Sequence, residues 1–431
     1  MAIDTIDEAT LASWVADARR RSIELYSDLS DADLAVPYLR IINPPIWELG
    51  HLAWFQEHWV LRHVLGQSPI HAGADALWNS AIIPHPERWT AALPSRGATL
   101  EYLELVGERV RAAISAHGAG ERLRYFTLLS IFHEDMHGEA FAYTRQTLGW
   151  PAPRAAAAAT AAAMAAALAP TLAPERRAAG PWPGDAAVGG GIYRVGAEPD
   201  LAPEFVFDNE KWAHDIELAP FRIARAAVTQ GELAAFVEDR GYETRALWTD
   251  AGWAWRAAAG ATCPLWWRRD GDGRWERRAF DRWIPIDTQP HRPMVHVNAH
   301  EAEAWCRWAG RRLPSEAEWE VAARGAPIAG NLGLAAGDTV DVGAFGDADS
   351  QWGCRQMIGN VWEWTSTAFG PYPGYVRDPY QEYSEPWFGD HRVLRGGCFV
   401  TQPRLLRPTW RNFYLPERRD VWAGFRTCAI D

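Results

Sequence analysis

Two histidines four residues apart give the clearest chemical signal in the chain. The stretch FHEDMHGEA, residues 132–140, places His133 and His137 in a run that fits a helix. Positions four apart lie on one face of an α-helix, so both imidazoles can reach a single ion. A stable site needs a third ligand, and PPIWELGHLAWFQEHW offers His51 or His58 on a second predicted helix. Three imidazoles from two facing helices would leave coordination positions open for substrates.

The spacing of His133 and His137 also fits two alternatives. Pairs of histidines at this separation arise by chance in many helices, where they have no chemical role. The letters HEDMH also satisfy the zinc-protease pattern HExxH, with Glu134 in the position of the general base. Against a protease, the third ligand would come from upstream of the pair, and the C-terminal half is unlike any protease partner.

The first 150 residues are helical in pattern. Apolar residues recur at spacings of three and four, as in Leu103, Val106 and Val110. Four segments show this pattern, at about residues 7–29, 44–66, 98–117 and 120–148. Helices of this length form an up-and-down bundle, so residues 1–150 are predicted to be a four-helix domain that carries the histidines.

The remainder of the chain has a different character. Residues 151–185 are rich in alanine and proline and are predicted to be a linker. Residues 186–431 hold most of the tryptophans and glycines, in short apolar runs broken by turn signals, with helices near 229–239 and 299–309. This pattern predicts an irregular α+β domain in which long loops carry a site.

Composition and charge disfavour several kinds of partner. The 431-residue chain has a formal net charge of -12, and both nucleic acid and an anionic membrane surface would attract a basic patch. We expect no secretory signal and no membrane span. The five cysteines are odd in number and form no CxxC pair, which fits a reducing compartment. A cytoplasmic protein that acts on a small polar substrate is therefore expected.

Four ordered motifs in the C-terminal half make the prediction specific. They are RRLPSEAEWEVAARG (311–325), GNVWEWT (359–365), VLRGGCF (393–399) and RNFYLPERRDVWAGFRT (411–427). In this order they resemble the marker motifs of the formylglycine-generating-enzyme or sulfatase-modifying-factor fold, a C-type-lectin-like α+β domain. Formylglycine-generating enzymes depend on two cysteines where this chain has Thr401 and Leu406, so their copper chemistry is not expected.

Both halves together resemble the ergothioneine sulfoxide synthases, iron(II) enzymes that join a DinB-type helical bundle to this C-terminal domain. The two histidine-bearing stretches look like the bundle segments that supply the iron ligands of that family. The resemblance implies Fe(II) bound by His51, His133 and His137, with His58 left structural. It also implies the family's reaction, in which O2 is used to attach a chalcogen to the imidazole C2 of trimethylhistidine (hercynine). Three neutral imidazoles leave room on the ion for hercynine, the chalcogen donor and O2.

The segment DPYQEYSEPWFG resembles the active-site loop of that family. The match implies that Tyr380 donates a proton during catalysis and that Tyr383 lines the site, with Tyr375 as the fallback for the proton donor. Arg88, in PHPERW, stands where the family carries donor-binding arginines, and the open alternative is an ordinary surface arginine.

The last motif departs from the family pattern. The ergothioneine branch reads RNWD, followed by proline and a double arginine, where this chain reads RNFYLPERR. Arg418 is retained, but Phe413 replaces the tryptophan and Tyr414 replaces the aspartate that grips the ammonium group of a cysteine-type donor. Because Met136 stands where the family has a glutamine near hercynine, the quaternary ammonium is expected to rely on Asn412 and on aromatic faces.

The lost carboxylate indicates a donor without an ammonium group. A related branch of the same family makes selenoneine from a selenosugar, and the chain is predicted to be a selenoneine synthase. The alternative is an ergothioneine-type sulfoxide synthase that joins hercynine to a cysteine-type thiol. Two other classes stay open, a non-catalytic ligand-binding module and a zinc-dependent thiol transferase. A three-histidine metal cluster argues against the first, and the appended C-terminal domain argues against the second.

Overall fold

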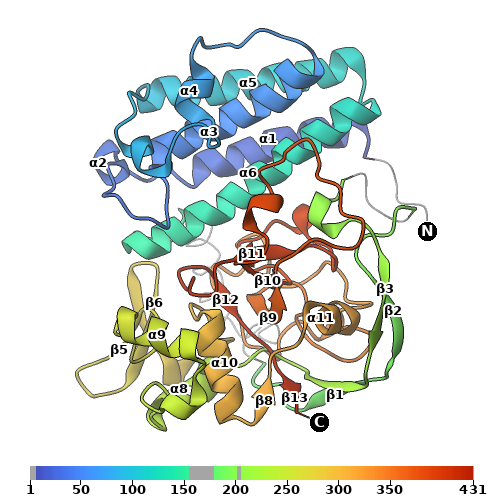
Figure 1. Cartoon of the computed structure of the whole chain (residues 1–431). Helices are drawn as coiled ribbons and strands as arrows, with labels where there is room; N and C mark the ends of the chain where they lie inside the picture. The colour runs from blue at the N-terminus through green and yellow to red at the C-terminus, as the bar shows by residue number, and fades with distance from the viewer. Residues whose placement is uncertain (1–5, 155–178, 201–204, 431) are drawn as a thin grey trace, which may run out of the picture. The chain divides into compact units, whose positions relative to one another are not determined.

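The computed structural model describes residues 6–154, 179–200 and 205–430. The chain divides into two compact units, Met1–Thr144 with Leu201–Phe205 and Arg145–Asp200 with Val206–Asp431. Figure 1 shows helices in the first unit and small sheets with helices in the second. Most of the predicted linker lies outside the described residues. No helix that the structure describes is long and apolar enough to cross a membrane.

Four long helical stretches dominate the first unit, as the apolar spacing predicts. They are α1 (Glu8–Glu24), α3 (Pro45–Gln56) continued by the π-helix η1 (Glu57–Val64), α5 (Arg96–His117) and α6 (Glu121–Leu148). The short helical elements between them are α2 (Asp31–Leu34), α4 (Ala74–Trp78) and the 3-10 helix η2 (His85–Trp89). The spacing does not predict the short elements because each of them buries two side chains at most.

Local signals explain where the long helices begin. The side chains of Asp7 and Ser95 accept hydrogen bonds from backbone N–H groups in the first turns of α1 and α5, and Pro45 is the first residue of α3. Helix α5 packs against both α1 and α3. The fully buried apolar side chains of α5 are Leu103, Val106 and Val110. The bundle therefore closes on the apolar stripe that the sequence shows.

The second unit contains four small sheets, with strand orders β1-β4-β13-β8, β11-β10-β9-β12, β2-β3 and β5-β6-β7. The first sheet is made of β1 (Asp185–Val188), β4 (Phe221–Ala224), β13 (Cys428–Ala429) and β8 (Arg311–Arg312). The second is made of β11 (Asn412–Tyr414), β10 (Arg392–Arg395), β9 (Trp362–Ala368) and β12 (Ala423–Gly424). The others are β2 (Gly191–Val195) with β3 (His214–Leu218), and β5 (Trp267–Arg269) with β6 (Trp275–Ala279) and β7 (Arg282–Pro285). Among these strands only β12 pairs in parallel, with β9.

Among the described residues of this unit, four α-helices interrupt the sheets. Two of them, α8 (Gln230–Glu238) and α10 (Ala299–Trp308), confirm the two predicted helices. The other two are α9 (Asp250–Ala259) and α11 (Glu316–Ala322). The 3-10 helices of the unit are η4 (Asp208–Glu210), η5 (Arg245–Leu247), η6 (Ile286–Thr288), η7 (Gly346–Ala348), η8 (Glu385–Trp387) and η9 (Pro403–Leu405). The prediction of an irregular α+β domain is confirmed.

Buried ion pairs run through the core of the second unit. The Arg426 guanidinium donates to both carboxylate oxygens of Glu363, at 2.6 and 2.9 Å. Arg411 binds Glu316 in the same two-pronged way, at 2.8 and 3.0 Å. Buried charges are tolerated when they are paired and hydrogen-bonded in this manner. Since both arginines belong to the last of the four sequence motifs, that motif supplies part of the charged core.

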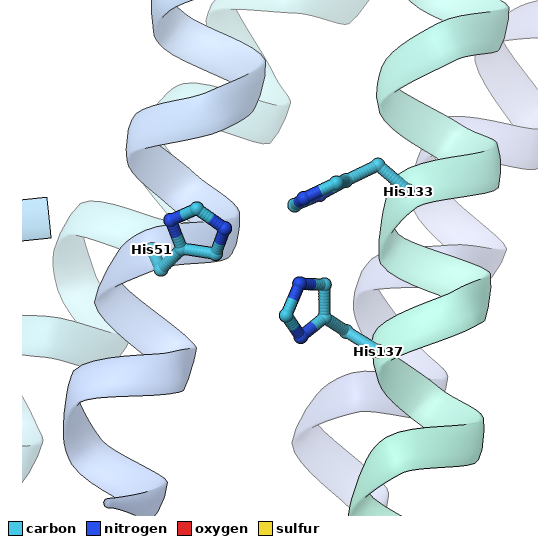
Figure 2. Close-up of side chains that lie close together, drawn as sticks. All are labelled: His51, His133 and His137. Carbon is cyan, nitrogen blue, oxygen red and sulfur yellow. The ribbon is translucent and has the colours of Figure 1, made fainter. Parts of the chain in front are cut away.

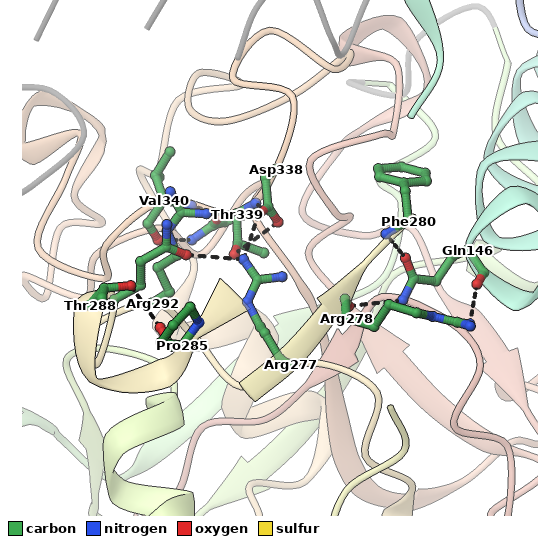
Figure 3. A network of polar contacts seen from close by, with 12 residues as sticks. Gln146, Arg277, Arg278, Phe280, Pro285, Thr288, Arg292, Asp338, Thr339 and Val340 are labelled. Atoms are coloured by element: carbon green, nitrogen blue, oxygen red, sulfur yellow. Dashed lines mark hydrogen bonds and ion pairs between the residues drawn. The ribbon is translucent and has the colours of Figure 1, made fainter. Parts of the chain in front are cut away.

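A second polar network joins the last turn of α6 to β6 (Figure 3). The Gln146 side-chain amide donates to the backbone carbonyl of Arg278 at 3.0 Å, and its oxygen accepts the backbone N–H of Phe280. In the same network Asp338 forms ion pairs with Arg277 and Arg292. The end of the long helix therefore belongs to the second compact unit.

Candidate metal centre

Three histidines of the first unit gather around one point. His51 comes from α3, and His133 and His137 come from α6. Figure 2 shows their rings converging between the two helices. One ring nitrogen from each lies within 4.8 Å of the others, and no other cluster of metal-binding side chains is found among the described residues. His51 and His133 are buried and His137 is partly exposed. The structure therefore brings together the three residues predicted to be ligands.

A backbone carbonyl orients His51. Its Nδ1 lies 2.7 Å from the carbonyl oxygen of Trp78, at the end of α4. On the helix, the Trp47 ring stacks on the His51 ring with centroids 4.9 Å apart. A Cβ at Gly50 would lie 2.1 Å from Nε1 of Trp78, so only glycine allows the indole to approach α3 this closely. Because a carbonyl only accepts, Nδ1 carries the proton and Nε2 is left to bind a metal.

The short helix α4 is fixed to α3 and η1 through Asp75. Its carboxylate accepts the indole N–H of Trp54 at 2.7 Å and two hydrogen bonds from Arg62, at 2.6 and 2.8 Å. The hydrogen bonds from Arg62 are the main reason that the pKa of Asp75 is lowered to about 2. The carbonyl that orients His51 is thus held by an ion pair a turn away.

The other two histidines have different neighbours. Nδ1 of His137 lies 2.5 Å from Oε1 of Glu48, a carboxylate that is 1 % exposed. The His133 ring stacks face to face on Phe55, with centroids 3.6 Å apart and planes inclined by 3°. As with His51, a bond from Nδ1 to an acceptor turns Nε2 of His137 toward the cluster.

Burial keeps two of the three histidines uncharged. Desolvation, followed by the neighbouring His137, lowers the pKa of both His51 and His133 well below the ordinary value for histidine. Neutral imidazole is the form that binds a metal ion, since a proton would occupy the ligand nitrogen. Three imidazole nitrogen donors on two helices fit a divalent first-row metal with open coordination positions, and imidazole suits iron, zinc and copper alike.

The other residues of the first unit that the sequence singles out contact neighbouring side chains and are not part of the cluster. Glu134 pairs with Arg19 of α1 at 3.2 Å, so its carboxylate faces α1 and cannot act as the base of an HExxH protease. His58 stacks on Trp54 and stays outside the cluster. Arg88 is partly buried, and its guanidinium lies 4.2 Å from the centroid of the Trp47 ring that stacks on His51.

In the second unit, three of the predicted aromatic residues lie together. The ring of Tyr383 is 6.0 Å from that of Tyr380 and 5.8 Å from that of Phe413, centroid to centroid. Tyr383 also stacks on Phe207 at 4.2 Å, and burial raises its pKa. Asn412 adjoins Phe413 on β11 and accepts the backbone N–H of that residue. The loop and the last motif therefore contribute to one aromatic surface within this unit.

Asp208 holds the loop that carries these tyrosines. It accepts the hydroxyl hydrogen of Tyr375 at 2.8 Å and that of Ser384. Burial, and then this hydrogen bond to Asp208, raise the pKa of Tyr375. The fallback proton donor thus has a hydroxyl group that is engaged with a buried carboxylate.

Arg418 has an acidic partner inside the protein. Its guanidinium binds both carboxylate oxygens of Asp420, at 2.7 and 2.8 Å, and lies 5.1 Å from the ring centroid of Tyr414. The positive charge retained from the family pattern is therefore balanced within the motif itself.

Sequence reasoning did not assign a role to Glu48, Asp208 or Asp420, and it named Trp78 only as a residue that could line the cleft. The sequence offered a signal for two of these residues. Glu48 precedes His51 by three on a predicted helix and so shares its face, and Asp420 follows the double arginine directly. The contacts of Trp78 and Asp208 join segments far apart in the chain, so no sequence pattern near either residue predicts them.

Comparison with known proteins gives matches over both halves. Residues 15–142 match the DinB superfamily, and residues 171–430 match the sulfatase-modifying factor enzyme 1-like domain. The hercynine oxygenase of Mycolicibacterium thermoresistibile is 34 % identical, over 97 % of this chain and 94 % of its own length. That of Mycobacterium tuberculosis is 35 % identical, over 96 % and 97 %. The formylglycine-generating enzyme of Streptomyces coelicolor is 31 % identical, over 58 % of this chain and 89 % of its own length.

The protein is thus a multidomain α+β chain in which a DinB helical domain with a three-histidine cluster precedes a sulfatase-modifying-factor domain. This confirms the predicted fold class. The chain belongs to the hercynine oxygenase family and is an oxidoreductase. The predicted resemblance is confirmed at the level of this family.

Proposed function

We propose that the chain uses Fe(II) and O2 to form a carbon–sulfur bond at the imidazole C2 of hercynine, with a cysteine-type thiol as donor. The observation that carries the proposal is the cluster of three histidines in a chain that aligns with hercynine oxygenases over nearly its whole length. The donor set suits iron(II), and a site with three protein ligands has room for substrates.

The protein's own residues would divide the work as follows. His51, His133 and His137 hold the ion, and the acceptors on His51 and His137 fix which ring nitrogen faces it. When bound, iron(II) supplies the redox chemistry by which O2 is activated. Aromatic faces such as Phe413 attract the trimethylammonium group of hercynine.

The overall reaction balances for a thiol donor. The C2–H bond of hercynine and the S–H bond of the thiol break, a C2–S bond and an S–O bond form, and the second oxygen atom of O2 leaves as water. Oxygen is reduced by four electrons, all of which come from the two bonds that break and from sulfur oxidation. A proton must be delivered as O2 is reduced, and we assign this step to the hydroxyl of Tyr380, whose loop is fixed by Asp208.

A second candidate donor is a selenosugar, which would make the product selenoneine. The observation in its favour is the environment of Arg418. A cysteine-type donor brings an ammonium and a carboxylate, but Tyr414 offers no anion and Arg418 is already paired with Asp420. A neutral donor needs no charged partner on the protein. A cysteine-type donor needs an anion for its ammonium group and a cation for its carboxylate, so either the Arg418–Asp420 ion pair must open or other charged side chains must bind these groups. The relatives favour sulfur, and this motif favours selenium.

One experiment separates the candidates. The iron-loaded chain is incubated with hercynine and O2, and with either a cysteine-type thiol or a selenosugar, and the products are identified by mass. A hercynine–thiol sulfoxide supports the sulfur reaction. Turnover with the selenosugar alone assigns the chain to the selenoneine branch. Unchanged hercynine with both donors overturns both assignments and leaves a binding module or a different transferase.

A further inference from the structure

Glu48 carries a buried carboxylate. The packing of its neighbours does not explain why a charged group stands at this position. It lies in the first turn of α3, one turn before His51, and 1 % of its side chain is exposed. Its carboxylate reaches across to α6, where Oε1 lies 2.5 Å from Nδ1 of His137. Within the part of the chain that is described, His137 is its one ion-pair partner.

A carboxylate in this position needs a compensating positive charge. Burial of an ionised carboxylate is costly unless a cation or several hydrogen bonds balance it. Two other buried carboxylates of the molecule meet this need with arginine, as Glu134 does with Arg19 and Glu363 does with Arg426. The three-histidine cluster lies on the far side of His137, where a bound divalent ion would supply a positive charge.

We propose that Glu48 is a positioning residue that acts on the metal through His137, as its charge partner. The carboxylate accepts the Nδ1 hydrogen, which fixes the orientation of the ring and makes Nε2 a stronger donor. A divalent ion bound at Nε2 would supply positive charge on the side of the ring opposite Glu48. Metal affinity and the fit of the ion thus depend on a residue that does not bind the metal.

The histidines of the cluster divide into unequal ligands on this basis. His51 donates to the neutral carbonyl of Trp78, and His137 donates to the anionic Glu48. A hydrogen bond to a charged acceptor is roughly twice as strong as one to a neutral acceptor. His137 is therefore the ligand whose donor strength the protein raises most through its partner.

The test is a Glu48→Gln variant titrated with Co(II) alone, so that the readout does not require hercynine or turnover. Gln keeps the size and an oxygen acceptor but removes the charge. We expect binding to weaken by about 10- to 100-fold, with a changed visible absorption spectrum of the bound Co(II). The rise in melting temperature that Co(II) causes should also shrink. A purely structural Glu48 would lower the melting temperatures with and without metal alike and leave that rise unchanged.

Glu57→Gln is the matched control. Glu57 is fully buried on the same helical stretch, but it accepts the hydroxyl of Tyr102 and the backbone N–H of Ile70 and forms no bond to a cluster histidine among the described contacts. This variant should bind Co(II) like the wild type. The inference about Glu48 rests on the proposed metal site, but different results would overturn the metal site and the role of Glu48. Absence of Co(II) binding by the wild type would overturn the metal site. Wild-type affinity in Glu48→Gln, or equal weakening in both variants, would overturn the role of Glu48 alone.

Discussion

The helical unit and the α+β unit position their candidate functional residues in different ways. In the helical unit, the spacing of four places two histidines on one face of α6, and α3 supplies the third from the opposite side. In the α+β unit, the tyrosines lie on an irregular loop that is held by Asp208, 167 residues away from Tyr375. Regular helices thus let the sequence specify a site locally, whereas the loop depends on contacts between distant segments.

The largest effect is expected when a cluster histidine is removed. His51→Ala or His133→Ala should reduce product formation from hercynine below detection, because two histidines are too few to hold the ion. The control is His58→Ala, which removes a histidine of the same helical stretch that lies outside the cluster. Product formation is measured by mass spectrometry. Retained activity in either cluster variant would place the metal elsewhere.

The next effect concerns the loop of the α+β unit. Tyr380→Phe removes the proposed proton donor and should slow product formation by about a hundredfold or more. Co(II) affinity should be unchanged, because the cluster lies entirely in the helical unit. Tyr375→Phe, which removes a hydroxyl that donates to Asp208, should have a much smaller effect. A reversed order of the two variants would assign the proton to Tyr375.

In the helical unit, Gly50→Ala probes the packing behind His51. The added Cβ would meet the Trp78 indole at 2.1 Å and displace the carbonyl that orients His51. We expect a loss of about 1–3 kcal/mol in stability from overpacking and a roughly 10- to 100-fold loss of Co(II) affinity. Gly107→Ala on α5 meets no atom within 4 Å and should stabilise the helix by about 0.5–1 kcal/mol. Unchanged Co(II) affinity in Gly50→Ala would show that the carbonyl does not matter.

Asp208→Asn tests how the loop is held. The substitution weakens the hydrogen bonds from Tyr375 and Ser384 by about 1.5 kcal/mol, enough to lower the equilibrium constant for ordering of the loop about tenfold. Turnover should fall by up to that factor while the Co(II) affinity stays at the wild-type value. Steady-state rates and Co(II) titrations of the same preparation provide the comparison. A parallel loss of Co(II) affinity would contradict the expectation that the loop of the α+β unit and the histidine cluster act independently in metal binding.

The last effect concerns stability rather than activity, through a buried histidine of the α+β unit that lies outside the metal cluster. Burial, followed by the charge of Arg277, lowers the pKa of His296 to about 3. Its unfolded form titrates near the ordinary value, so as pH falls below that value the unfolded state binds a proton that the folded state does not. Stability is therefore full at neutral pH and falls by about 2 kcal/mol by about pH 5 on account of this residue.

His296→Asn should remove that part of the acid sensitivity, and asparagine tolerates the positive φ of 62° at this position. The measurement is urea unfolding of the metal-free protein at both pH values, followed by tryptophan fluorescence. The cluster histidines contribute equally to the wild type and the variant, so the difference reports His296 alone. An identical pH dependence in the two proteins would show that His296 is not buried as a neutral group.

Much of the fold could be predicted from the sequence because its elements have local causes. The four long helices follow from apolar spacing, and the three histidines follow from that spacing together with the family resemblance. The spacing of Glu48 and His51 places them on one helix face, but the bond between Glu48 and His137 spans 89 residues, and the spacing does not indicate it. The internal pairing of Arg418 with Asp420 was also not foreseen, although the residues are two apart, because the arginine was interpreted through the donor it would bind.

The most direct test of the account is the amount of iron(II) that the full chain binds under anaerobic conditions. The cluster has one place for an ion, so the wild type should bind about one equivalent, and His133→Ala and His51→Ala should bind essentially none. Equal iron content in the wild type and in both variants would contradict the assignment of the three histidines as the metal site, and with it the function proposed for the chain.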